Sequence, residues 1–192
     1  MSWDAHKLLF QTYGLGIVLV RDRRNLERSF TSVPDYLVDV RGDVQRVNPC
    51  DLGIELTREP RGLRLWYSLQ VLGREGIANR IEWAFCLASR VQETIEAIPD
   101  WEITSHPSMG IITFRFAPDG FSRDVIDGMN QDISLENLSR GHSTVYTTTV
   151  NGDKVLRMAT TNPETTFADI DSTLDLLDSI ARAKLQAAAE TQ

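Results

Sequence analysis

The side chains best suited to chemistry lie at three separate places in the chain. Lys7 ends the run Asp4-Ala5-His6-Lys7 and is followed by apolar residues, Tyr36 lies in a polar segment, and Arg157 lies in a largely apolar one. A lysine amine can condense with a carbonyl carbon, a tyrosine hydroxyl can donate a proton, and an arginine can bind a carboxylate through two hydrogen bonds. Taken singly, Lys7 is better explained as an ordinary surface lysine and Tyr36 as a loop tyrosine, and Arg157 could be a surface charge on a strand.

The first third of the chain predicts little regular structure around Lys7 and Tyr36. Residues 16–20 are almost all apolar and rich in β-branched side chains, which predicts a strand buried on both faces. A short helix is expected over residues 25–30. Residues 31–53 are polar and aperiodic, and a connection of that length is usually functional or mobile.

The rest of the chain has clear periodicity. Residues 62–72 are expected to form a helix that Gly73 ends, and a longer helix follows, with apolar residues on one face and Pro99 after its end. Later elements are expected as strands over 101–103 and 109–116, a helix capped by Ser122, strands over 144–150 and 153–160 joined by Asn151-Gly152, and a helix from Thr166.

This order of elements predicts the fold class. From Pro99 onward it is strand, strand, helix, strand, strand, helix, which is an α+β layer with helices on one side of a mostly antiparallel sheet. The first twenty residues do not belong to that layer. We expect their strand to complete a sheet made mainly by another polypeptide, so that the whole is of the α/β class.

Composition excludes several classes of protein. With 192 residues, of which 42% are hydrophobic, the chain can form a core, and its net charge of −7 argues against nucleic-acid binding. It has no run of about 18 apolar residues that could cross a membrane. Cys50 and Cys86 are far apart, which predicts reduced thiols in a cytoplasmic protein. The spacing of His6, His106 and His142 predicts no metal site.

Four segments resemble, in the same order, the group II pyridoxal-phosphate (PLP) amino-acid decarboxylases. The family includes the aromatic amino acid, histidine, glutamate and diaminobutyrate decarboxylases, which have fold type I. The resembling segments are Ser2 to Phe10, Val33-Pro34-Asp35-Tyr36-Leu37, Thr57 to Trp66 and Lys154 to Pro163. The third departs from the family pattern at Glu59, which replaces a usual arginine, and at Pro60.

The resemblance implies two catalytic residues. Lys7 would be the lysine that forms the Schiff base with the cofactor aldehyde, and Tyr36 would be the proton donor on a mobile catalytic loop. In relatives where phenylalanine replaces this tyrosine, the chemistry can divert to aldehyde formation. Tyr36 therefore favours simple decarboxylation to an amine, and an aldehyde-forming variant is the alternative.

The resemblance also implies four binding roles. His6 would lie against the cofactor, and Asp4 stands where many members have an asparagine that helps to hold the phosphate. Arg157 would lie near the substrate carboxylate, and Thr57 would lie where the family tunes its side-chain pocket. The identity of the amino-acid substrate is not readable, because the pocket walls come partly from other chains.

The position of Lys7 near the start of the chain predicts which domains of the family the chain contains. Residues 1–60 resemble the end of the PLP-binding large domain with its catalytic loop, and residues 61–192 a helical linker and the C-terminal small domain. In the family, most of the cofactor cradle lies before the lysine, so a partner must supply it. Since Met1 stands just before the motif, we expect a natural split into two genes; a fragment or an engineered cut is the alternative.

Two functions follow from this organisation. The first is the small subunit of a split decarboxylase, in a heterotetramer of two large and two small chains. The second is a non-catalytic or regulatory remnant that binds a decarboxylase. The joint presence of Lys7, Tyr36 and Arg157 favours the first.

Overall fold

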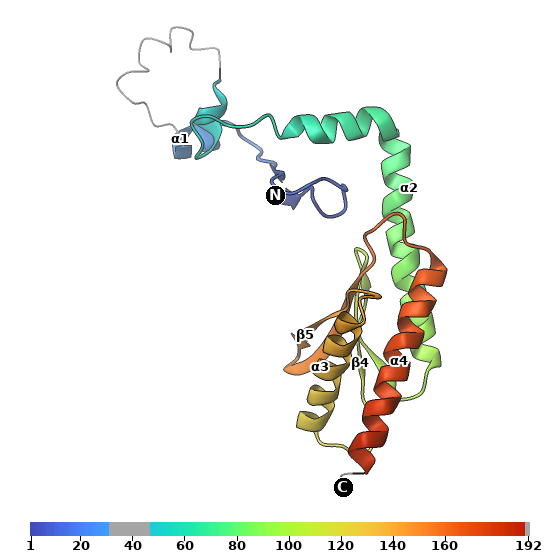
Figure 1. The fold of residues 1–192 in the computed structure, drawn as a ribbon. Coiled ribbons are helices and arrows are strands. Elements are labelled where there is room, and N and C mark those ends of the chain that lie inside the picture. Colours follow the sequence, from blue (N-terminus) through green and yellow to red (C-terminus); the bar gives the residue numbers. More distant parts are fainter. Residues whose placement is uncertain (31–46, 191–192) are drawn as a thin grey trace. The chain divides into compact units, whose positions relative to one another are not determined.

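The chain forms two compact units joined within one long helix. The computed structural model describes residues 1–30 and 47–190, and the units are Met1–Gly73 (unit 1) and Arg74–Gln192 (unit 2). Helix α2 (Gly62–Ala97) runs from the first into the second (Figure 1). It is interrupted at Gly73, whose φ of 67° and ψ of 175° are not helical. Because this backbone region is open mainly to glycine, Gly73 ends the first helical segment, as the sequence predicts.

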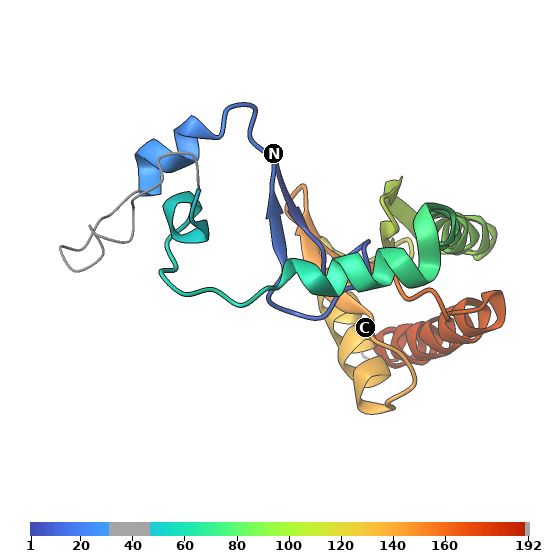
Figure 2. The same ribbon diagram turned by 90° about the horizontal axis from the view of Figure 1, so that it is seen from above.

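Unit 1 begins with a small hairpin. Strand β1 (Ser2–Asp4) pairs antiparallel with β2 (Gly16–Val18), and Figure 2 shows the two strands side by side in blue. The N-terminal ammonium donates a hydrogen bond to the Leu19 carbonyl at 2.9 Å, and the Leu19 amide donates one back to Met1 at 2.8 Å. The strand ends at Val18 rather than at Val20 as expected, and its pairing with β1 runs from Ser2–Val18 to Asp4–Gly16.

The rest of unit 1 adds helix α1 (Arg24–Phe30), a 3-10 helix (Pro49–Leu52) and the first part of α2. Its buried apolar side chains among the described residues are those of Ala5, Leu8 and Leu15. Many larger apolar side chains of the unit are exposed: Trp3, Tyr13, Val18, Leu19, Val20, Ile54, Leu56, Leu63, Trp66, Tyr67, Leu69 and Val71. The described part of unit 1 therefore has too little buried apolar surface to form a core of its own.

Unit 2 is an antiparallel sheet with helices on one face. The strands are β3 (Trp101–Ser108), β4 (Ile111–Phe116), β5 (Tyr146–Val150) and β6 (Asp153–Ala159), in the order β3-β4-β6-β5. The helices are α3 (Arg123–Ser139) and α4 (Phe167–Ala189), together with the part of α2 from Arg74 onward. This arrangement confirms the predicted α+β layer.

The core of the protein lies between that sheet and its helices (Figures 1 and 2). Alternate residues of β4 and β6 point to the helices and are almost fully buried, whereas their neighbours point to the opposite, helix-free face. The fully buried large side chains of the core are Leu87, Val91, Ile95, Ile112, Phe114, Phe116, Ile133, Val145, Leu156, Leu174, Leu177 and Ile180. The helix-free face of the sheet carries mainly polar side chains, Thr113, Arg115 and Arg157 among them, together with the buried Val155.

The two helices that follow strands begin differently. Thr166 caps α4: its hydroxyl accepts from the Asp169 amide at 3.2 Å, and the Asp169 carboxylate accepts from the Thr166 amide at 2.8 Å. The hydrogen bonds from the Thr166 hydroxyl and amide lower the pKa of the Asp169 carboxyl. Ser122 holds the same position at the start of α3, but its hydroxyl makes no capping hydrogen bond, so the expected side-chain cap is absent there.

The turn between β5 and β6 is the one that the Asn151-Gly152 pair predicts. Both residues have positive φ, 52° and 90°, which matches the right-handed twist of a hairpin. Directly after the turn, the Asp153 carboxylate forms an ion pair with Arg123 of α3, with 2.7 Å between Oδ1 and Nε. The turn is thus held to the helix layer.

Replacing Gly152 by alanine is expected to lower the free energy of unfolding by about 1–2 kcal/mol, because an L side chain is strained at positive φ. The new Cβ would also lie 2.6 Å from Arg123 Nη2, so that side chain must move. Urea unfolding followed by circular dichroism measures the effect. Gly128→Ala in α3 is the control, since a Cβ there meets no atom within 4 Å and should be neutral or stabilising. Equal stability of the two variants would contradict the prediction.

Candidate active site

Lys7 lies on a tight turn between β1 and β2. The Ala5 amide donates to the Leu15 carbonyl at 3.2 Å, and the Gln11 amide donates to the Ala5 carbonyl at 3.1 Å. The Phe10 amide closes the turn on the Lys7 carbonyl at 3.0 Å. Because Ala5 is fully buried while the Lys7 side chain is 65% exposed, the backbone is anchored and the amine is accessible.

Asp4 is the immediate partner of that amine. Lys7 Nζ lies 2.8 Å from Asp4 Oδ2, and both side chains are about half exposed or more. The hydrogen bond from the Lys7 ammonium, and then its charge, lower the pKa of the Asp4 carboxyl. Asp4 therefore stays ionised beside the amine, as a carboxylate that orients it.

Of the other predicted residues of unit 1, His6 lies within this turn and Thr57 lies much later in the sequence. The His6 ring stands 5.6 Å, centroid to centroid, from the ring of Tyr13. Thr57 is exposed in an irregular segment held by Arg61, whose guanidinium donates to both carboxylate oxygens of Glu55 at 2.6 and 3.0 Å. These bonds lower the pKa of the Glu55 carboxyl and raise that of Arg61.

Arg157 lies in unit 2, on the helix-free face of β6. It is half-buried and is paired in register with Thr113 of β4 on one side and Tyr146 of β5 on the other. Within the described residues it has no hydrogen bond or ion pair, so its guanidinium is available to a ligand. Tyr36 lies outside the described residues.

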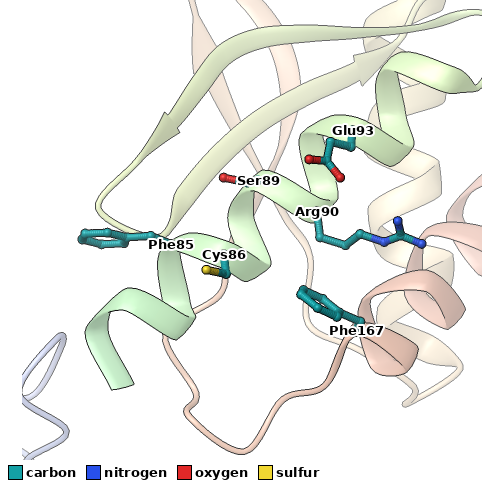
Figure 3. Close-up of a pocket in the computed structure, with 6 residues that line it drawn as sticks. All are labelled: Phe85, Cys86, Ser89, Arg90, Glu93 and Phe167. Carbon is teal, nitrogen blue, oxygen red and sulfur yellow. The ribbon is translucent and has the colours of Figure 1, made fainter. Parts of the chain in front are cut away.

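Two cavities in the described part of the chain have walls that include none of the predicted site residues. One, of about 890 Å³ in unit 1, has Leu15, Leu52 and Leu65 among its walls and the charges of Arg58 and Arg61 at its edge. The other, of about 610 Å³ in unit 2, is an open groove on the surface of α2, beside the start of α4 (Figure 3). It is lined by Phe85, Cys86, Ser89, Arg90, Glu93 and Phe167.

Two of the residues that line the groove in unit 2 are engaged in contacts between α2 and α4. Arg90 binds both carboxylate oxygens of Asp171 at 2.9 Å, and the Phe167 ring packs against Trp83 at 4.8 Å between centroids. These contacts join α2 to α4, and no predicted site residue lines the groove.

Over residues 1–30 and 47–190 there is no helix long and apolar enough to cross a membrane. The same residues include no cluster of three or more His, Cys, Asp or Glu side chains fit to hold a metal ion.

Comparison with known proteins identifies the family. Residues 1–117 match the pyridoxal-dependent decarboxylase conserved domain, which is more than half of the chain. The chain belongs to this family, as the four resembling segments predict, and pyridoxal phosphate is the cofactor that the family uses.

Individual relatives agree with that assignment. The chain is 34% identical to the aromatic-L-amino-acid decarboxylase of Bacillus atrophaeus, over 88% of its own length and 36% of the relative's. It is 28% identical to the L-2,4-diaminobutyrate decarboxylase of Acinetobacter baumannii, over 91% of its length and 34% of the relative's. The chain thus spans about a third of the length of the curated relatives it matches.

Solved structures show the same fold. The crystal structure of mouse CSAD matches with a TM-score of 0.79 at 24% identity, over 94% of this chain and 39% of that one. At this identity the likeness establishes the fold and nothing beyond it, and it confirms the fold type I class expected from the sequence.

Proposed function

We propose that this chain is the small subunit of a PLP-dependent L-amino-acid decarboxylase. It supplies Lys7 and Tyr36 to an active site that a separate large subunit completes with the remaining cofactor cradle. The family assignment supports the chemistry. The share of its relatives' length that the chain spans, about a third, supports the need for further polypeptide.

The observation that carries the proposal is the surface of unit 1. The strand β2 and the residues after it expose Val18, Leu19 and Val20 by 62, 53 and 42%, and Val71 on α2 is 81% exposed. Large exposed apolar patches commonly mark surfaces that bind another protein. Their burial against a large subunit would remove this surface from water and hold the Lys7 turn in the partner's pocket.

The turn around Lys7 fits a cofactor that is held by a covalent bond to an amine. Lys7 Nζ is accessible and its backbone is anchored, while the ionised Asp4 carboxylate directs the amine from 2.8 Å away. The described residues 1–30 and 47–190 fit this attachment point alone, and the phosphate cradle is assigned to the large subunit. When bound, pyridoxal phosphate supplies the electron sink for loss of CO₂.

The chain's own residues bind the substrate and the cofactor and donate the proton. Arg157 binds the substrate carboxylate with its planar fork, and Thr57 contributes to the side-chain pocket. His6 lies against the cofactor. Tyr36 donates the proton that replaces CO₂ on the α-carbon, and exclusion of water around it favours this transfer over side reactions.

The assembly we propose is a heterotetramer of two large and two small chains, after the two-fold symmetry of the resembled family. An obligate interface of this kind buries on the order of 2,000 Å² or more. Co-expression with a candidate large chain that carries the N-terminal part of the family's fold, followed by size exclusion and mass measurement, should yield this complex. Only the complex should retain PLP after dialysis and decarboxylate an amino acid.

Two results would contradict the proposal. One is a monodisperse monomer of this chain that ignores the large chain. The other is stoichiometric PLP on the isolated chain that survives dialysis, since that would make the large subunit's cradle unnecessary. Val71→Glu, which places a charge on the exposed apolar surface, should weaken the complex, whereas Glu164→Gln in unit 2 is the control.

A further inference from the structure

The helix-free face of the sheet in unit 2 carries two parallel rows of side chains across its strands. In one row, Glu102 is paired in register with Arg115, and Val155 with Thr148. Arg115 and Val155 are the residues that follow the last β4–β6 pair, Phe114 and Leu156, on the two strands. The next row along the strands is Ser105, Thr113, Arg157 and Tyr146. Each row holds one arginine, so the two guanidinium groups can be compared directly.

The arginine of the first row is neutralised. The Arg115 side chain is 8% exposed, its Nε lies 3.2 Å from Glu102 Oε1, and its Nη1 lies 3.1 Å from Asp153 Oδ2. Asp153 is in turn paired with Arg123 of α3. Arg115 therefore holds β3, β4 and the β5–β6 hairpin together, with its charge balanced by two carboxylates.

The arginine of the second row has no such partners. Its row contains no carboxylate, and the hydroxyl of Thr113 is already engaged by Thr104 and Ser105 at 2.8 and 2.6 Å. Tyr146, the register partner of Arg157 on β5, is 56% exposed, and its hydroxyl has no hydrogen bond within the described residues. A guanidinium and a phenol that have no partner among residues 1–30 and 47–190 thus stand next to each other on adjacent strands.

We propose that Tyr146 is a substrate-binding residue whose hydroxyl donates a hydrogen bond to the same carboxylate that Arg157 binds. This inference rests on the proposed function of Arg157. Side chains of residues paired across strands stand about 5 Å apart at Cβ, which lets both reach one ligand group. A carboxylate offers about four lone-pair directions, of which the arginine fork uses two, so it can also accept the phenol hydrogen.

The contact exists only while the carboxylate is present. It is made to the bound amino acid and is lost when the carbon–carboxylate bond breaks and neutral CO₂ leaves. Tyr146 therefore contributes to binding of the amino acid rather than to the chemical step. The amine product has no carboxylate and should not sense Tyr146.

The test uses the assembled large–small complex. Tyr146→Phe should raise KM for the amino acid about 10-fold, the effect of one lost hydrogen bond to a charged group, with kcat nearly unchanged. Two probe pairs serve: L-tyrosine with tyramine, and L-2,4-diaminobutyrate with 1,3-diaminopropane. The inhibition constant of the amine should not change. A spectroscopic titration of the bound cofactor gives the amino-acid affinity independently of turnover.

Two control variants make the result specific. Thr148→Val changes the next residue on the same face of β5 and should leave KM as it is. If Arg157→Gln raises KM and Tyr146→Phe does not, the inference fails and the role of Arg157 stands. If Tyr146→Phe weakens amino acid and amine equally, it acts on the pocket in general and the inference also fails. A complex that decarboxylates neither probe overturns the inference for these substrates.

Discussion

Replacing Lys7 by arginine is expected to lower decarboxylation by the assembled enzyme by more than about 10³-fold. Arginine keeps the positive charge and the ion pair with Asp4, but its delocalised guanidinium does not condense with an aldehyde. Reduction of the wild-type complex with borohydride, followed by peptide mass spectrometry, should place a pyridoxyl group on Lys7. The Lys7→Arg complex should carry none and should lose the visible absorbance of the bound cofactor.

The matched control is Lys184→Arg. Lys184 is paired with Glu136 at 3.0 Å in unit 2, and this substitution keeps the pair and should leave activity intact. Full activity of the Lys7→Arg complex, or a pyridoxyl group at another lysine, would show that Lys7 is an ordinary surface residue.

A second consequence of changing Lys7 concerns Asp4 and needs no enzyme activity. Because Lys7 lowers the pKa of the Asp4 carboxyl, Lys7→Met should raise that pKa toward its usual value, which an NMR titration measures. The pair stabilises the folded turn at neutral pH, and this contribution is lost as the pH falls through the lowered pKa of Asp4. Lys7→Arg should leave the pKa low.

Replacing Tyr36 by phenylalanine is expected to lower amine formation by about 10²–10⁴-fold, the usual contribution of a positioned general acid. PLP binding and the attachment to Lys7 should remain, because phenylalanine differs only by the hydroxyl. An aldehyde product should appear where the proton transfer fails. Rates of amine, aldehyde and CO₂ release, measured together, test all of these expectations.

The control for this substitution is Tyr67→Phe, which removes a hydroxyl from a tyrosine of unit 1 that is 60% exposed and packs edge-on against Trp66. It should leave the rate unchanged. Amine formation by Tyr36→Phe at the wild-type rate would remove Tyr36 from the role of proton donor. The mobile catalytic loop and the role of Tyr36 on it thus remain predictions.

Much of unit 2, and the break in α2 that precedes it, was predictable from local sequence signals. The Asn151-Gly152 pair predicts the hairpin, Thr166 predicts the start of α4, and Gly73 predicts the break in α2, because each of these depends on a few adjacent residues. The burial of residues 16–20 was not testable in the same way. In the structure Val18, Leu19 and Val20 are exposed, and under the proposed function a large subunit would bury them.

The residues of the candidate site also differ in whether they could be predicted from local sequence. The motif around Lys7 was readable as a sequence because the residues that form its turn are contiguous. The pairing of Tyr146 with Arg157 was not, because cross-strand register places residues eleven positions apart side by side. The difference between the two caps has a local cause, since Asp169 stands three residues after Thr166 and completes a capping box, whereas Val125 stands three residues after Ser122.

The sequence by itself determined the family, the element order of unit 2 and the candidacy of Lys7, since motif, periodicity and turn chemistry are properties of short segments. Only the tertiary structure decided which arginine is free. Arg115 and Arg157 look alike in the sequence as charges on apolar strands, but Glu102 and Asp153 converge on Arg115 from two other strands. That convergence depends on the register of the whole sheet, and it leaves Arg157 as the guanidinium of this face that can bind a carboxylate.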